Sequence, residues 1–147
     1  YAPVEVYQPQ YSMVARENEE TIKWAYENGI GVMSYGSLGG GILTGKIREP
    51  KVYDPSDNRN RFYKHFREPM FSKVMKVVAV MDRISAGHDN VPLSQIALNW
   101  STQKPFICSG IVGAQKRKNV EENAAAFDWM LSDEEMKLLD DEIEKLI

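Results

Sequence analysis

The feature of this sequence that most constrains its fold is an alternation of apolar strands with amphipathic helices that occurs only three times. Residues 4–8 alternate valines with polar residues, residues 31–35 are mostly apolar and run into glycines, and residues 106–112 form a third apolar run. These patterns predict β-strands. Strands that alternate with helices favour parallel pairing, with right-handed crossovers and the helices outside. The sequence therefore predicts an α/β fold.

Apolar periodicity and stop signals predict the helices. Residues 17–28 carry acids in the first turn and end at Gly29, and a long polar segment at residues 49–69 separates this unit from the later helices. A further helix is expected from about residue 116 to 127, and Ser132 with Glu135 forms a capping box for the last one. The expected buried faces are Ile22, Ala25 and Tyr26, then Phe71, Val74, Met75, Val78 and Met81, then Leu93, Ile96, Ala97 and Trp100, and finally Met136, Leu139, Ile143 and Leu146.

Three strand–helix units are too few to complete a sheet of this kind. A (β/α) barrel closes with about eight strands, so both edges of a three-stranded piece would stay unpaired. We therefore expect a partial (β/α)8 TIM barrel with three parallel β/α units plus extra helices, in which residues 1–147 form one incomplete domain. Apolar side chains facing the absent strands would favour a homo-oligomer.

Composition excludes several classes of protein and site. The net charge of -3 gives no general attraction to nucleic acid or anionic membranes, and no apolar run is long enough to span a bilayer. Cys108 is the single cysteine, and His65 and His88 are isolated, so neither a metal site nor a nucleophilic constellation is expected. We expect a soluble, cytoplasmic protein.

One basic and aromatic stretch could suggest a nucleic-acid reader. We expect no such binding, because a loop of similar composition lies near the cofactor or substrate in the family that other segments of this chain resemble. The stretch holds Arg59, Arg61, Phe62, Tyr63, Lys64, His65, Phe66 and Arg67.

Four segments, taken in order, carry a family resemblance over nearly the whole chain. They are QPQYSM at residues 8–13 with Arg16, GIGVMSYGSL at 29–38 followed by GILTGK at 41–46, SQIALNW at 94–100, and IVGA at 111–114 with Asn119, Glu122 and Asn123 beyond it. Together they resemble the sixth to eighth strand regions of the aldo-keto reductases. The branch resembled has Tyr-Ser after the sixth strand and includes potassium-channel β-subunits and many bacterial reductases.

The resemblance implies a nicotinamide dinucleotide bound at the carboxyl ends of the strands. Gln8 matches the glutamine that hydrogen-bonds the nicotinamide carboxamide, and Tyr35 matches the aromatic on which the nicotinamide ring stacks. Without the family, Gln8 would be a buried strand glutamine satisfied by backbone, and Tyr35 a strand-end tyrosine packed under a loop.

The resemblance also implies two further groups of cofactor-binding residues. The first group approaches the cofactor pyrophosphate, and its glycines let backbone amides come close to the phosphates. Without the family resemblance, this glycine cluster would indicate only a flexible turn. The second lies where the family binds the adenosine and its ribose phosphate; Lys116 or Arg117 could contact that phosphate, which favours NADP over NAD. For Glu122 and Asn123 the alternative is a solvated helix face. The groups are Gly36, Ser37, Leu38 and Gly41, and then Gly113, Ala114, Lys116, Asn119, Glu122 and Asn123.

The family's catalytic tyrosine, lysine, aspartate and histidine come from its first four strands, and no residue of this chain matches them. We therefore expect no catalytic residue here and no carbonyl reduction by the polypeptide alone. Three alternatives remain open. In the first, the chain is the cofactor-binding half of an NADP(H)-dependent oxidoreductase that needs its N-terminal half. In the second, it is a non-catalytic nucleotide-binding module. In the third, it is a barrel fragment that pairs with a second copy of itself.

Overall fold

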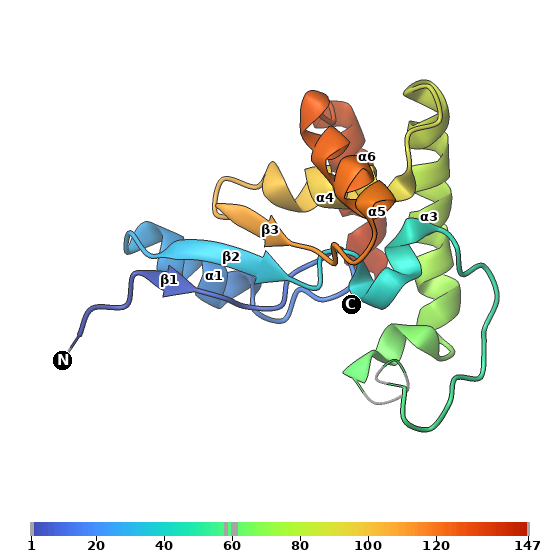
Figure 1. Ribbon diagram of the computed structural model, residues 1–147, viewed down its shortest axis with the longest axis horizontal. Helices are drawn as coiled ribbons and strands as arrows, with labels where there is room; N and C mark the ends of the chain where they lie inside the picture. Colours follow the sequence, from blue (N-terminus) through green and yellow to red (C-terminus); the bar gives the residue numbers. More distant parts are fainter. Residues whose placement is uncertain (1, 58, 60–61, 147) are drawn as a thin grey trace.

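A computed structural model describes residues 2–57, 59 and 62–146 of the chain (Figure 1). The strands and helices follow the predicted order, β-α-β-α-α-β-α-α, with short 3₁₀ turns between them. They are β1 (Val6–Tyr7), α1 (Glu19–Glu27), β2 (Gly31–Tyr35), α3 (Met70–Gly87), α4 (Leu93–Thr102), β3 (Ser109–Ile111), α5 (Arg117–Ala124) and α6 (Asp133–Ile143).

The strands form one parallel sheet in the order β1-β2-β3, which confirms the predicted partial barrel. Tyr7 pairs with Val32, and Tyr35 pairs with Ile111. Strand β2 has the predicted bounds because the chain turns with positive φ at Gly29 and Gly36, on either side of it. β2 is the central strand, with β1 paired on one side and β3 on the other.

The other two strands are shorter than predicted. At β1, only Val6–Tyr7 is ladder-paired, while the extended chain continues to an isolated bridge between Gln10 and Tyr35. Before β3, the Ile107 amide donates to the Lys104 carbonyl in a turn, so the apolar run there does not extend as a strand. Phe106 lies outside β3 but is still buried, because its ring packs edge-on against Tyr11 with the centroids 5.9 Å apart. This packing explains why the apolar run in the sequence begins before the strand does.

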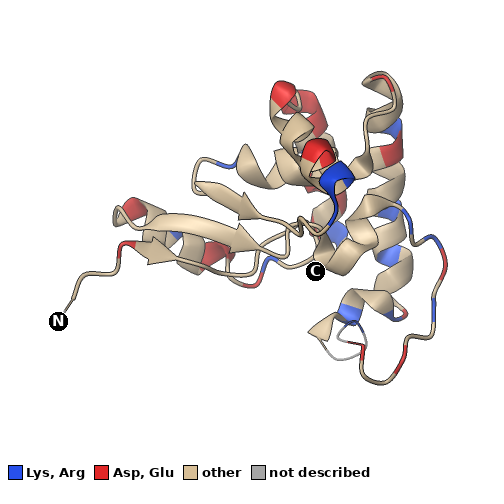
Figure 2. Cartoon of the chain, viewed as in Figure 1, with Lys and Arg blue, Asp and Glu red and all other residues tan. Residues whose placement is uncertain are grey.

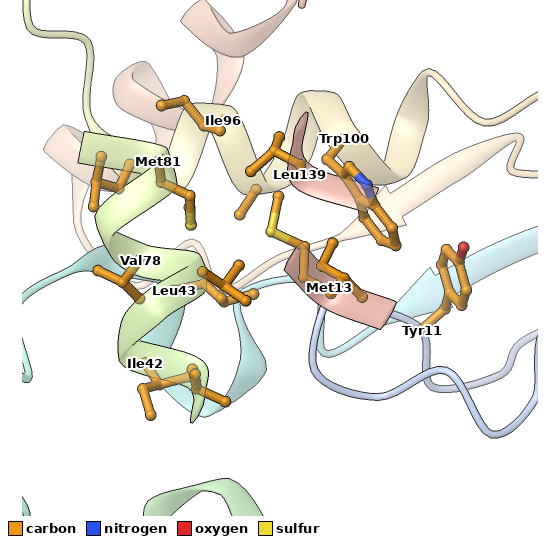
Figure 3. Packing of buried hydrophobic residues seen from close by; sticks show 14 of the residues in the cluster. Tyr11, Met13, Ile42, Leu43, Val78, Met81, Ile96, Trp100 and Leu139 are labelled. Carbon is orange, nitrogen blue, oxygen red and sulfur yellow. The ribbon is translucent and has the colours of Figure 1, made fainter. Parts of the chain in front are cut away.

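The helices enclose one continuous hydrophobic core (Figure 3). Helix α3 buries Phe71, Val74, Val78 and Met81 as predicted, while Met75 is half-buried. Helix α4 is buried on all sides except at Thr102, because α3, α5 and β3 all contact it. The predicted capping box at Ser132 and Glu135 is present at the start of α6.

The helices cover only one face of the sheet. Val32 and Ser34 point into this face and are fully buried. On the opposite face, Val6 is 55% exposed, Met33 36% and Tyr35 42%. This open face carries exposed apolar side chains, as the three-strand arc predicts, and self-association through it stays a prediction. Among the described helices, none is both long enough and apolar enough to cross a lipid bilayer.

A half-buried carboxylate at the start of α1 joins the helix to the segment that follows β1. Glu19 Oε2 accepts hydrogen bonds from Arg16 Nε at 2.8 Å and from the Tyr11 hydroxyl at 3.2 Å, and Glu19 Oε1 pairs with Lys23 Nζ at 2.7 Å. Burial alone would raise the pKa of Glu19, but the hydrogen bonds from Arg16 and Lys23 outweigh it and hold this pKa below its ordinary value. Burial and the neighbouring carboxylate raise the pKa of Tyr11.

We expect Glu19→Gln to lower the free energy of unfolding near neutral pH by about 1 kcal/mol and to flatten its acid dependence. Because the folded pKa of Glu19 is lowered, its contribution is present above the ordinary value of 4.5 and is lost as pH falls through the folded value. Urea unfolding at a series of pH values measures this. Glu20→Gln, on the exposed neighbour, should keep the wild-type slope, and an equal slope for both variants would contradict the assignment.

Candidate functional site

The carboxyl ends of β2 and β3 meet at one edge of the sheet, and a cavity of about 250 Å³ lies there. Because parallel strands end on the same side, the turns that follow Tyr35 and Ile111 are brought together although they are far apart in the sequence (Figure 1). We call this space the glycine-turn cavity. Its lining residues are Gly36, Ser37, Leu38, Gly40, Gly41, Tyr63, Ile111, Val112 and Gly113.

The floor of the cavity is a turn that only glycine can form readily. Gly36, Gly39, Gly40 and Gly41 have φ values of 74°, 57°, 65° and 98°, all in the region that side chains with a Cβ disfavour. This turn leads into a 3₁₀ helix, Gly39–Thr44. Backbone without Cβ atoms lets a ligand approach the peptide groups closely.

Ser37 is the buried polar group of this turn. The side chain is 1% exposed, and its hydroxyl has no hydrogen-bond partner. Gly110 of β3 lies beside it, since a Cβ at that position would stand 3.5 Å from Ser37 Oγ. A buried hydroxyl without a partner carries a desolvation cost, which a hydrogen bond to a ligand would offset.

The opposite wall is the turn after β3, which α5 holds in place. Asn123 is 9% exposed, and its Nδ2 donates to the Gly113 carbonyl at 3.3 Å. Glu122 accepts a 2.6 Å hydrogen bond from Ser94 Oγ of α4, and its carbonyl accepts from Gln95. Glu122 and Asn123 are therefore not a solvated helix face. They fix the position of the Gly113 turn against α4.

The remaining predicted residues lie outside the glycine-turn cavity. Gln8 follows β1 with an exposed side chain, so the alternative of a buried glutamine is wrong. Tyr35 ends β2 on the open face, where its amide donates to the Pro9 carbonyl at 2.9 Å. Ala114, Lys116 and Asn119 are exposed at the start of α5. The structure thus gathers Gly36, Ser37, Leu38, Gly41 and Gly113 around one cavity, and the other predicted residues are not among those that line it.

The long loop adds a residue that the sequence did not assign to the site, Tyr63. His65 of the same loop is 2% exposed, and its Nε2 lies 2.9 Å from the Gly39 carbonyl oxygen. Burial lowers the pKa of His65, although the bond to Gly39 opposes this shift. The sequence indicated a loop too long to be a simple connection, and the family resemblance placed a similar loop near the cofactor or substrate, but neither singled out Tyr63.

Two cations in the described part of the basic and aromatic stretch pair with carboxylates. The Arg59 guanidinium pairs with Asp57 and lies over the Tyr53 ring, and Lys64 Nζ pairs with Glu17 at 2.7 Å. His65 and Phe66 are buried, and Arg61 lies outside the described residues. Figure 2 shows basic and acidic residues intermixed along this loop.

Both histidines have structural partners, and the described part of the chain contains no cluster of histidine, cysteine and acidic side chains suited to a metal ion. His88 Nε2 lies 2.7 Å from Glu135, the residue that caps α6, and the His88 ring packs on Trp129 at 4.5 Å. This contact ties the end of α3 to the start of α6.

Comparison with known proteins agrees with this fold. The family described as the aldo/keto reductase family matches residues 1–144. Aldo-keto reductase YhdN of Bacillus subtilis is 30% identical over 99% of this chain and 44% of its own length, and a probable voltage-gated potassium channel subunit beta of Arabidopsis thaliana is 33% identical over 84% and 38%. The structure of the glycerol dehydrogenase AKR11B4 from Gluconobacter oxydans superposes with a TM-score of 0.86 at 25% identity, covering 99% of this chain and 44% of that one. The chain thus spans less than half the length of these relatives, and it belongs to the aldo/keto reductase family.

Proposed function

We propose that this chain is the cofactor-binding part of a nicotinamide-dependent oxidoreductase that interconverts carbonyls and alcohols, with NADP(H) as the cofactor. The observation that carries the proposal is the convergence of two turns, residues 36–41 and Gly113, on one cavity, with the buried and unpartnered hydroxyl of Ser37 in the first of these turns. A Cβ-free backbone and a hydroxyl donor suit the oxygens of a pyrophosphate. Membership of the aldo/keto reductase family supports this assignment.

The other predicted residues would hold the two ends of the dinucleotide. Gln8 directly follows β1 and Tyr35 ends the neighbouring strand β2, and both are exposed, which suits contact with the nicotinamide carboxamide and ring. At the adenosine end, Arg117 already pairs with Glu121 at 2.7 Å, so we assign the ribose phosphate to Lys116 with Asn119 beside it. When bound, a nicotinamide supplies the hydride, and the residues of this chain supply binding and orientation.

Binding of NADPH by the purified chain tests the proposal. We expect saturable binding in calorimetry, and about fivefold weaker binding by Ser37→Ala, because the pyrophosphate loses one hydrogen bond. Ser72→Ala, on an exposed serine of α3, is the matched control and should bind like wild type. NADH should bind more weakly, since it lacks the phosphate assigned to Lys116.

We also propose that the 147-residue chain binds the dinucleotide without reducing carbonyls, because no residue matches the family's proton donor or the groups that tune it. A folded wild-type chain that shows no saturable NADPH binding would refute the cofactor assignment. Carbonyl-dependent NADPH oxidation at rates typical of intact relatives would refute the second proposal alone.

A further inference from the structure

Helix α5, which begins after Lys116 and contains Asn119, has no apolar face to fix it in place. All eight residues of α5 belong to the described part of the chain, and among them only Asn123 is buried. The side chain of Val120 is 46% exposed. A helix this short is marginal in isolation, and most helices in proteins are stabilised by packing of an apolar face. The position of α5 therefore depends on polar contacts.

Two buried side chains of α4 supply these contacts. Ser94 is 3% exposed, and its hydroxyl donates to Glu122 Oε1 at 2.6 Å. Gln95 is 6% exposed, and its Nε2 donates to the Glu122 carbonyl at 3.0 Å. One residue of α5 is thus held by its side chain and by its backbone. The next residue, Asn123, donates to the Gly113 carbonyl, so the same contacts determine where the Gly113 turn lies.

Gln95 is itself held by a residue that follows α5. Trp129 Nε1 donates to Gln95 Oε1 at 2.9 Å, and the Trp129 ring packs on His88 with the centroids 4.5 Å apart. An indole N–H only donates and a backbone carbonyl only accepts, so the two partners determine which end of the Gln95 amide faces each of them. Gln95 therefore joins Trp129 to the Glu122 backbone in a single orientation.

We propose that Gln95 is a positioning residue for the adenosine end of the bound dinucleotide, acting through Glu122 and α5, and that Trp129 holds Gln95 in the required orientation. The inference rests on the proposed cofactor function and extends it to two residues that need not contact the cofactor. A displacement of α5 would move Lys116 and Asn119 away from the ribose phosphate, while the glycine turn after β2 would keep its place.

Gln95→Met tests this role, because methionine has a similar shape and makes neither hydrogen bond. In titrations of the full chain, we expect about tenfold weaker binding of NADPH and of adenosine 2′,5′-bisphosphate, which is the adenosine half of NADP. Thermal unfolding of each variant establishes that it is folded.

Gln103→Met is the matched control. Gln103 caps the other end of α4, and its amide also makes two hydrogen bonds, both to the backbone of Leu131 and neither to α5. Its Nε2 donates to the Leu131 carbonyl at 3.0 Å, and its Oε1 accepts from the Leu131 amide at 2.9 Å. The control should lose stability as Gln95→Met does, but bind both ligands like wild type.

Trp129→Phe tests the second part of the proposal, because it removes the donor to Gln95 and keeps an aromatic ring beside His88. We expect about threefold weaker binding of both ligands. In the Gln95→Met background, the same substitution should cause little further loss, since Trp129 then has no amide to orient. If Gln95→Met does not fold, Trp129→Phe decides the proposal, and unchanged affinity overturns it.

The outcomes separate this inference from the cofactor function. A wild-type chain that binds neither ligand overturns both. If wild type binds NADPH, the cofactor function stands, and the inference is overturned by unchanged affinity in folded Gln95→Met or by equal losses in Gln95→Met and Gln103→Met. It is also overturned if adenosine 2′,5′-bisphosphate does not bind to wild type, or binds equally well to wild type and Gln95→Met.

Discussion

Trp100→Ala is expected to lower the free energy of unfolding by about 3–5 kcal/mol, the largest loss from any single substitution considered for this chain. Trp100 is completely buried in α4, where its ring stacks on Tyr11 with centroids 5.5 Å apart (Figure 3). Its Nε1 donates to Asp140 Oδ1 of α6 at 2.7 Å. The alanine variant leaves a large cavity and removes a hydrogen-bond donor from a carboxylate at the same time.

The network around Trp100 gives the measurement its controls. Lys104 Nζ lies 4.9 Å from the Trp100 ring and 2.8 Å from Asp140 Oδ2, so it still partly compensates this carboxylate after the substitution. Trp100→Phe keeps most of the apolar volume and should cost less than the alanine variant. Trp24, which is 57% exposed on α1, should tolerate alanine within about 0.5 kcal/mol. Urea unfolding followed by circular dichroism would contradict the expectation if the two tryptophan-to-alanine variants were equally stable.

Gly39→Ala is expected to destabilise the chain by about 2–4 kcal/mol, because two costs combine at this glycine. Its φ of +57° lies in the left-handed region, which costs any residue with a Cβ about 1–2 kcal/mol. The added Cβ would also stand 2.7 Å from Val14 Cγ2, closer than real Cβ contacts, and 3.2 Å from Ile42 Cγ2, a tight contact. Val14 or the turn must therefore shift.

A second glycine separates these costs. Gly29 has a φ of +73° with no atom within 4 Å of an added Cβ, so Gly29→Ala should show the backbone strain alone, about 1 kcal/mol. The difference between the two variants in chemical denaturation measures the overlap with Val14 and Ile42. Val14→Ala should recover part of the loss in the Gly39→Ala background and none in the Gly29→Ala background. Equal losses at Gly39 and Gly29 would show that the turn adjusts freely.

The Gly39 turn links stability to the proposed binding site. Val14 from the loop after β1 packs on one side of Gly39, and His65 from the long loop bonds to its carbonyl. A shift of this turn would move Ser37 and Gly41, which line the glycine-turn cavity. We therefore expect NADPH affinity to fall with stability in Gly39→Ala, and to stay near the wild-type value in Gly29→Ala.

Local sequence patterns determined the elements of this fold. The bounds of β2 follow from glycine turns on either side, the start of α6 from the capping box at Ser132, and the buried face of α3 from the spacing of Phe71, Val74, Val78 and Met81. Each pattern acts between residues that are at most four positions apart, so it is legible in one sequence. The family resemblance extended this to the glycine turn and Gly113, which do share one cavity.

Tertiary packing decided what those patterns could not show. Phe106 is buried by Tyr11 instead of by the sheet, and Glu122 is held by Ser94 of another helix. Tyr63 lines the glycine-turn cavity from a loop that has no periodic pattern to indicate which of its residues face the site. The sequence by itself thus determined the order of strands and helices and the turns that follow the strands. Which distant side chains meet at those turns depended on parallel pairing and on the path of the long loop, because contacts between residues far apart in the chain leave no periodic pattern in it.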